Sequence, residues 1–268
     1  MGSDRRPPKK SLGQNFLVSD GAIKGIIKAV RGDDSLPVFE IGPGKGALTL
    51  PLAEGGTQIA AFEIDEALAE ETAALLEGFE NAEVVPADIR KVDLDAEAGA
   101  RGWGGYALAG NIPYMLTSTV LLGLPSLKGC RRAVIMMQKE VGERVLSSPG
   151  SRESGILPVF LQSYLAVKRV MTLRPGSFQP KPKVDSVVLV FTPIGRENAP
   201  ADRGGFLSLL KSAFSQRRKK LSNALKNVPG LPDVSVLERR SGVDLSRRPE
   251  ELVLEEWFAL FSAAGGRG

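Results

Sequence analysis

The chain has 268 residues with no histidine and one cysteine, Cys130. This composition excludes catalysis by Ser-His-Asp or Cys-His groups, zinc bound by histidine, and an intrachain disulfide. Residues 32–97 hold 16 acidic and three basic side chains, a net charge of −13, so the overall charge of +4 leaves +17 on the rest of the chain and favours a nucleic-acid partner.

The sequence also indicates where the protein acts. Sparse cysteine fits a reducing compartment, and no apolar run approaches the roughly 18–20 residues of a membrane span. The first ten residues are charged but no apolar segment follows them, which argues against a secretory signal. We therefore expect a cytoplasmic protein that neither spans nor binds a membrane.

The chain begins with a basic stretch rich in Pro and Gly, residues 1–13, which we interpret as a mobile arm. A helix is predicted next, with Ser19 or Asp20 as its cap. Its apolar residues recur at helical spacing: Ile23, Ile26, Ile27 and Val30.

Strands then alternate with helical segments. Strands are predicted at VFEI (38–41), QIAAFEID (58–65), EVV (83–85), 106–110 and 133–137, with helices between them that include residues 66–79 and 118–124. This alternation is typical of βαβ units, so the fold class is α/β with a mostly parallel sheet.

The rhythm changes after residue 168. KRVMTL (168–173) and SVVLVF (186–191) predict two strands added antiparallel to the sheet. From residue 196 the pattern is helical, with helices predicted at 206–214, 216–227 and 249–261. We expect a ligand-binding catalytic domain over 14–195 and a helical domain over 196–268.

A glycine-rich turn, EIGPGKG at 40–46, follows the first of these strands. Gly42 and Gly44 let the backbone approach a ligand, although a tight turn without a ligand has the same pattern. Gly42, Gly44 and Ala47 also match a loose dinucleotide pattern, so an NAD-dependent oxidoreductase stays an alternative.

Two carboxylates lie at or just after the ends of the following strands. Glu63 lies 17 residues beyond Gly46 and can accept hydrogen bonds from both ribose hydroxyls of an adenosine cofactor, either NAD or S-adenosylmethionine. Asp88 follows the next strand and can accept from the amine of the cofactor's adenine. The alternatives are a helix cap for Glu63 and a plain turn residue for Asp88.

The segment Asn111-Ile112-Pro113-Tyr114 follows the fourth strand and points to methylation of a base amine. The lone pair of adenine N6 is delocalised into the ring, so acceptors must draw it toward a tetrahedral shape. The oxygen of Asn111 and the carbonyl of Ile112 supply two, because Pro113 favours an extended Ile112. Tyr114 offers a face on which the base can stack. The same four residues are also well suited to a turn that binds no ligand.

These motifs resemble a known family. QNFL (14–17), EIGPGKGALT (40–49), FEID (62–65), NIPY (111–114), MMQKEVGERV (136–145), FQPKPKVDSVV (178–188) and FSQRRKKLSNALKN (214–227) together look like the bacterial small-subunit ribosomal RNA adenine dimethyltransferases. The similarity extends from about residue 9 to 260. Its last two segments favour the small-subunit branch over the erythromycin-resistance branch that acts on 23S RNA.

The resemblance implies a class I, Rossmann-like methyltransferase sheet of seven strands with a small helical C-terminal domain. It implies dimethylation of N6 on two adjacent adenosines in a hairpin loop near the 3′ end of 16S RNA, within the maturing 30S subunit, with S-adenosylmethionine as donor and no metal. Catalytic roles then fall to Asn111, Ile112, Pro113, Tyr114 and Phe178. Cofactor contacts fall to Asn15, Leu17, Gly42, Gly44, Glu63, Asp88 and Asn111.

One basic run is a candidate RNA contact. The predicted helix at 216–227 places four cations in succession, where they would bind phosphate or simply face solvent: Arg217, Arg218, Lys219 and Lys220. A non-catalytic RNA-binding assembly factor of the same fold stays a third possibility, although the intact NIPY segment argues against it. We expect a monomer.

Overall fold

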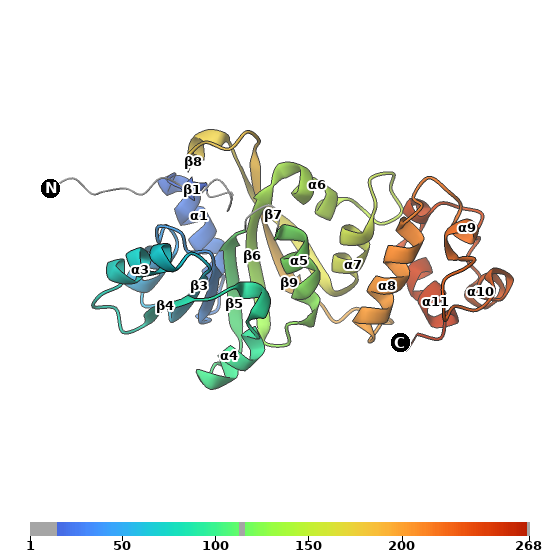
Figure 1. Cartoon of the computed structure of the whole chain (residues 1–268), viewed down its shortest axis with the longest axis horizontal. Helices are drawn as coiled ribbons and strands as arrows, with labels where there is room; N and C mark the ends of the chain where they lie inside the picture. The colour runs from blue at the N-terminus through green and yellow to red at the C-terminus, as the bar shows by residue number, and fades with distance from the viewer. Residues whose placement is uncertain (1–14, 113–115, 267–268) are drawn as a thin grey trace. The chain divides into compact units, whose positions relative to one another are not determined.

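The computed structural model describes residues 15–112 and 116–266. Within these ranges the chain forms two compact units (Figure 1). One comprises the described parts of Met1–Val120, Leu127–Gly142 and Lys168–Thr192, and the other comprises Leu121–Ser126, Glu143–Val167 and the described part of Pro193–Gly268. We refer to them as the sheet unit and the helical unit.

The main sheet has seven strands in the order β4-β3-β2-β5-β6-β9-β7. These strands are β4 (Ala82–Pro86), β3 (Ile59–Glu63), β2 (Val38–Ile41), β5 (Tyr106–Asn111), β6 (Cys130–Gln138), β9 (Ser186–Pro193) and β7 (Leu165–Leu173). The first five are parallel and β9 is antiparallel to β6. The expected α/β class with a seven-stranded, mostly parallel sheet is confirmed.

The order of the strands reverses at β2, which lies between β3 and β5. Ile41 is level with both Phe62 of β3 and Gly110 of β5, and Asn111 is level with Met136 of β6. The residues that follow these strands therefore meet at one edge of the sheet. In open α/β sheets this edge is where ligands bind.

Helices of the sheet unit are α1 (Asp20–Arg31), α2 (Thr49–Glu54), α3 (Glu66–Leu75) and α4 (Leu94–Ala100), with a 3-10 turn η2 (Ile89–Lys91). Ser19 caps α1 by accepting from Ala22 N. Ile26 and Val30 of α1 pack with Val38, Ala107 and Val134 on one face of the sheet. On the strands, Phe39 and Tyr106 alternate with these residues and pack together with ring centroids 4.8 Å apart. Burial on both faces explains the nearly continuous apolar strands.

A short second sheet adds to this unit. Strand β1 (Phe16–Leu17) pairs antiparallel with β8 (Phe178–Gln179), so that Leu17 lies opposite Phe178. A 3-10 turn, η4 (Pro175–Ser177), precedes β8, and Val18 N donates to Ser177 O at 2.9 Å. The pairing brings together two segments that are 162 positions apart in sequence, and the motif analysis did not predict it.

The remaining helices are α5 (Thr117–Gly123), η3 (Leu124–Ser126), α6 (Lys139–Leu146), α7 (Ile156–Tyr164), α8 (Arg203–Phe214), α9 (Leu221–Leu225), α10 (Val234–Ser241), η5 (Pro249–Glu251) and α11 (Leu254–Ala263). In the helical unit, the ring of Phe206 on α8 packs against four aromatic side chains: Phe160, Tyr164, Phe258 and Phe261. Trp257 stacks on Phe214 with centroids 5.6 Å apart. These rings form the apolar centre of the unit.

The prediction that residues 216–227 form one helix is wrong. Arg217, Arg218 and Lys219 lie in a turn after α8, and Lys220 is the N-cap of α9. Leu221 N donates to Arg247 O and Ser222 N to Leu245 O, each at 2.9 Å. Because tertiary carbonyls take these N–H groups, the helix cannot continue through them.

The start of the last predicted helix is also wrong. Residues 249–251 form the separate turn η5, and α11 begins at Leu254. Among the described residues, no helix has the length and apolar character needed to cross a membrane.

Candidate functional site

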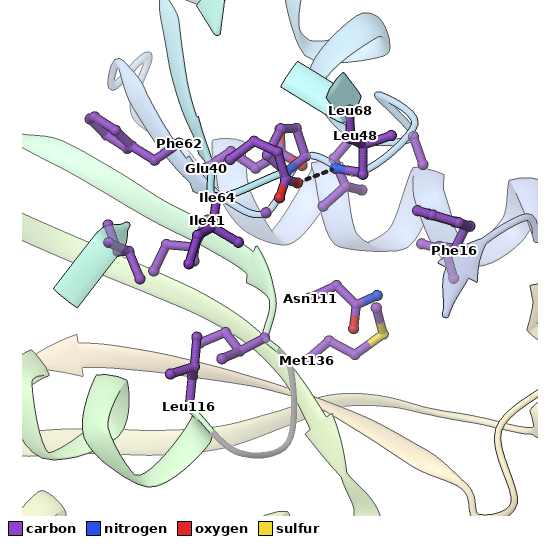
Figure 2. A pocket seen from close by; sticks show the side chains of 18 of the residues that line it. Phe16, Glu40, Ile41, Leu48, Phe62, Ile64, Leu68, Asn111, Leu116 and Met136 are labelled. Atoms are coloured by element: carbon purple, nitrogen blue, oxygen red, sulfur yellow. Dashed lines mark hydrogen bonds between the residues drawn. The ribbon is translucent and has the colours of Figure 1, made fainter. Parts of the chain in front are cut away.

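A cavity of about 210 Å³ opens at the carboxyl edge of the sheet. Its lining includes every described residue that the sequence predicted for catalysis or cofactor binding: Asn15, Leu17, Gly42, Gly44, Glu63, Asp88, Asn111, Ile112 and Phe178. Pro113 and Tyr114 lie outside the described residues. In Figure 2, Leu48 and Leu68 lie on one side of the cavity and Asn111, Leu116 and Met136 lie on the other.

The glycine-rich loop forms one wall. Gly42 has φ +68°, and a Cβ placed there would meet no atom within 4 Å, so the backbone faces open space. Gly44 has φ +58°, and a Cβ there would approach the Phe16 ring to 3.1 Å. Thr72 on α3 donates to Gly44 O, which fixes the loop. The loop is thus a cradle that the Thr72 hydroxyl holds in place and whose glycines admit a ligand close to the backbone.

Glu63 ends β3 and is 5% exposed. Its Oε2 accepts from Gly44 N at 3.3 Å and its Oε1 from Asp65 N at 3.1 Å, so a backbone donor fixes each oxygen. Burial raises the pKa of Glu63, and the backbone N–H groups of Asp65, Gly44 and Ile64 oppose the rise. A carboxylate has about four lone-pair sites, so it keeps acceptor capacity for a ligand.

A second buried carboxyl in the cavity was missed as a site residue. Glu40 on β2 is 2% exposed, and its Oε2 accepts from Thr49 Oγ1 at 2.7 Å. Burial raises the pKa of Glu40 to about 7, with the charge of Glu63 adding to the rise and the Thr49 hydroxyl opposing it. A glutamate inside an apolar strand was the available sequence signal.

Asp88 caps the turn η2, and its side chain is 12% exposed. Its Oδ1 accepts from Arg90 N at 3.0 Å, and the Arg90 guanidinium holds both carboxylate oxygens at 2.5–3.0 Å. The guanidinium of Arg90 lowers the pKa of Asp88. Arg90 also lines the cavity, a position that the sequence analysis did not assign to the site.

Asn111 ends β5, and its Nδ2 donates to Asn15 O at 2.9 Å. A backbone carbonyl only accepts, so the amide nitrogen must face Asn15 and the side-chain oxygen must point elsewhere. Ile112 follows, 1% exposed, with its N–H donating to Met136 O at 3.4 Å. The structure therefore holds the amide of Asn111 in one orientation beside the cavity.

The β1–β8 pair borders the same cavity. The Phe16 ring has Lys45 Nζ 5.0 Å from its centroid, and Phe178 is 3% exposed opposite Leu17. Ile64, which follows Glu63, also lines the cavity and is 46% exposed. A large apolar side chain that is exposed inside a cavity offers a surface for a flat ligand. Its position directly after the strand-ending glutamate was a signal that the sequence analysis did not use.

The four cations of the predicted RNA contact lie in the helical unit and do not line this cavity. Arg217 Nη2 donates to Arg152 O at 2.5 Å, and all four side chains are exposed. Their role, like the roles of the cavity residues, stays a prediction.

The strand order, with the glycine cradle after β2 and a carboxylate after β3, defines a class I methyltransferase. The family model described as ribosomal RNA adenine dimethylase matches residues 6–264. The chain belongs to the ribosomal RNA adenine dimethylase family.

Individual relatives agree with this assignment. The chain is 38% identical to ribosomal RNA small subunit methyltransferase A of Geobacter sulfurreducens, covering 99% of each protein, and 40% identical to the protein of that name from Geobacter metallireducens, covering 97% of each. A dimethyladenosine transferase structure from Plasmodium falciparum matches with a TM-score of 0.74 at 25% identity, over 94% of this chain and 98% of that one. The 23S rRNA methyltransferase ErmE matches with a TM-score of 0.69 at 25% identity, over 94% and 100%.

Proposed function

We propose that this enzyme dimethylates N6 of two adjacent adenosines in a hairpin loop near the 3′ end of 16S rRNA, in the maturing 30S subunit in the cytoplasm. The observation that carries the proposal is the held amide of Asn111, whose nitrogen is committed to Asn15 O and whose oxygen is therefore left to accept from a substrate amine. The names of the curated relatives support the small-subunit substrate.

S-adenosylmethionine fits the residues of the cavity. Glu63 would accept from the ribose hydroxyls, because its backbone donors hold the carboxylate in place and leave it acceptor capacity. The open face of Gly42 leaves room for the ligand against the backbone, and Ile64 offers an apolar surface for the adenine. Asn15 and Leu17 would border the cofactor from β1. When bound, this donor supplies a methyl group on a sulfonium, which is already activated for transfer.

The chain's own residues then need only prepare the nucleophile. The Asn111 oxygen and the Ile112 carbonyl accept from the N6 hydrogens and draw the nitrogen lone pair out of conjugation with the ring. The nitrogen gains one methyl group and loses one proton in each transfer, so four transfers complete two dimethyladenosines. Tyr114 and Phe178 would hold the two faces of the target base. Because the donor is activated, this chemistry does not need the histidine base that the sequence lacks.

We propose that residues 14–195 contain the catalytic machinery and that residues 196–268 contact RNA through the exposed cations of the turn after α8. Exposed cations of this kind can neutralise phosphates and release their counterions. The protein would act as a monomer without a metal.

The test is labelled methyl transfer from S-adenosylmethionine to three substrates in parallel: undermethylated 30S subunits, mature 30S subunits and 23S RNA. We expect label in the undermethylated 30S subunits only, at two adjacent dimethyladenosines of 16S RNA. Label confined to 23S RNA would instead place the enzyme in the erythromycin-resistance branch, to which the ErmE similarity also points. Binding of NAD in preference to S-adenosylmethionine would refute both assignments.

A further inference from the structure

The carboxylate of Asp88 keeps one acceptor site beyond its contacts with Arg90. Oδ1 accepts from Arg90 N at 3.0 Å and Oδ2 from Arg90 Nη2 at 2.5 Å, while the single Nε–H is shared between them, with Nε 2.9 Å from Oδ1 and 3.0 Å from Oδ2. Among residues 15–112 and 116–266, only Arg90 donates to this carboxylate group. Three hydrogens on about four lone-pair sites leave one site for a ligand, and the slightly longer Nε contact favours Oδ2 as the oxygen that carries it.

Residue 90 fixes this carboxylate in two ways. Its backbone N–H sets the position of Oδ1, and its guanidinium grips the carboxylate from the side with the paired geometry that arginine forms with such groups. Arg90 itself is exposed and has no other recorded partner among the described residues, so the contact does not serve the packing of the core. A side chain that lines the cavity, holds a second cavity residue and supports nothing else points to a role in the site.

The charges around the cavity also support a role for Arg90 in the site. The cavity contains three carboxyl groups, and burial raises the pKa of Glu40 and Glu63. Asp88 has its pKa lowered, first by the hydrogen bonds from Arg90 and also by the charge of Lys91. The other cation on the cavity lining, Lys45, lies over Phe16. Arg90 thus lets Asp88 stay ionised, and an acceptor on both oxygens, to a lower pH than an aspartate at its ordinary pKa.

We propose that Arg90 is a positioning residue for the cofactor's adenine, holding Asp88 so that Oδ2 accepts a hydrogen bond from the 6-amino group. The proposal rests on the proposed function, because it takes the cofactor to contain adenine. It makes Arg90 a determinant of specificity for a 6-aminopurine, although the guanidinium itself need not touch the cofactor.

The test compares two ligands by calorimetric titration of the full chain. One is S-adenosylhomocysteine, and the other is its purine analogue with hydrogen in place of the 6-amino group. We expect the wild type to prefer the amine by about tenfold or more, as one hydrogen bond to a charged group predicts. Arg90→Gln should lose most of this preference by weakening the binding of S-adenosylhomocysteine, while the purine analogue binds as before.

Lys91→Gln is the matched control: it removes a neighbouring cation that acts on the Asp88 carboxylate through its charge, and it keeps the backbone N–H that donates to Asp88 O at 2.8 Å. Lys91→Gln should keep the preference for the amine.

A second readout is the pH dependence of ligand affinity. Without Arg90 the pKa of Asp88 returns upward, so the affinity of Arg90→Gln for S-adenosylhomocysteine should fall at a higher pH than that of the wild type as acid is added.

Three results separate the possibilities. Equal amine preference in Arg90→Gln and the wild type would overturn the proposal, because Asp88 would then need no support from residue 90. Tighter binding of S-adenosylhomocysteine by Arg90→Gln would also overturn it and would show that the guanidinium competes with adenine. Failure of the wild type to bind S-adenosylhomocysteine would instead refute the proposed function.

Discussion

Replacing Glu40 by glutamine should make the protein more stable at neutral and alkaline pH. The carboxyl of Glu40 is 2% exposed inside β2, and burial raises its pKa from 4.5 to about 7. In the unfolded chain the same group ionises at its ordinary pKa. The folded state is therefore favoured while Glu40 is protonated, and this contribution is lost as pH rises from the unfolded value through the folded one.

The size of the effect follows from the difference between 4.5 and about 7. Each pKa unit corresponds to about 1.36 kcal/mol, so the free energy of unfolding should lose about 3 kcal/mol between acid and alkaline conditions. Glutamine stays neutral, and its amide oxygen can still accept from Thr49 Oγ1. Below pH 4.5, Glu40→Gln and the wild type should have nearly the same free energy of unfolding. Above a pH of about 7, the free energy of unfolding of Glu40→Gln should be higher by about 3 kcal/mol.

The assay is urea unfolding of both proteins across this pH range, without cofactor. The difference between the two proteins isolates Glu40, because all other titrating groups are shared. Glu54→Gln is the matched control, since Glu54 lies exposed at the end of α2 and its loss removes a charge without removing a buried carboxyl. Parallel pH profiles for Glu40→Gln and the wild type would refute the reasoning.

Two further predictions concern the reaction and its substrate. Asn111→Ala should lower turnover by orders of magnitude while S-adenosylhomocysteine still binds in calorimetry, because the amide acts on the target amine; normal turnover would remove that role. Replacing Arg217, Arg218, Lys219 and Lys220 together by glutamine should weaken RNA binding and flatten its salt dependence. The slope of log K against log salt concentration should fall by up to about 0.9 for each duplex phosphate contact that is lost. Neutralising the exposed pair Arg239 and Arg240 on α10 is the control. An unchanged salt slope in the fourfold variant would show that the turn is only a solvated surface and does not contact RNA.

The sequence by itself determined the fold class and the edge of the sheet where the site lies. Alternating strands and helices fix a parallel sheet, and the carboxyl ends of parallel strands share one edge. Gly42 and Asp88 follow strands, and Glu63 and Asn111 end strands, so their common location could be predicted from the chain order alone. The composition also required a mechanism without histidine.

Only the tertiary structure decided which groups contact one another across long stretches of chain. The amide of Asn111 is oriented by Asn15 O, 96 positions away, and Phe178 reaches the cavity because β8 pairs with β1. The helix predicted over residues 216–227 is interrupted by a turn at 217–219, because the carbonyls of Arg247 and Leu245 accept from the N–H groups of Leu221 and Ser222. The physical reason is the same in each case. Local propensity and period depend on near neighbours, whereas these hydrogen bonds have distant partners that only the folded chain brings within reach.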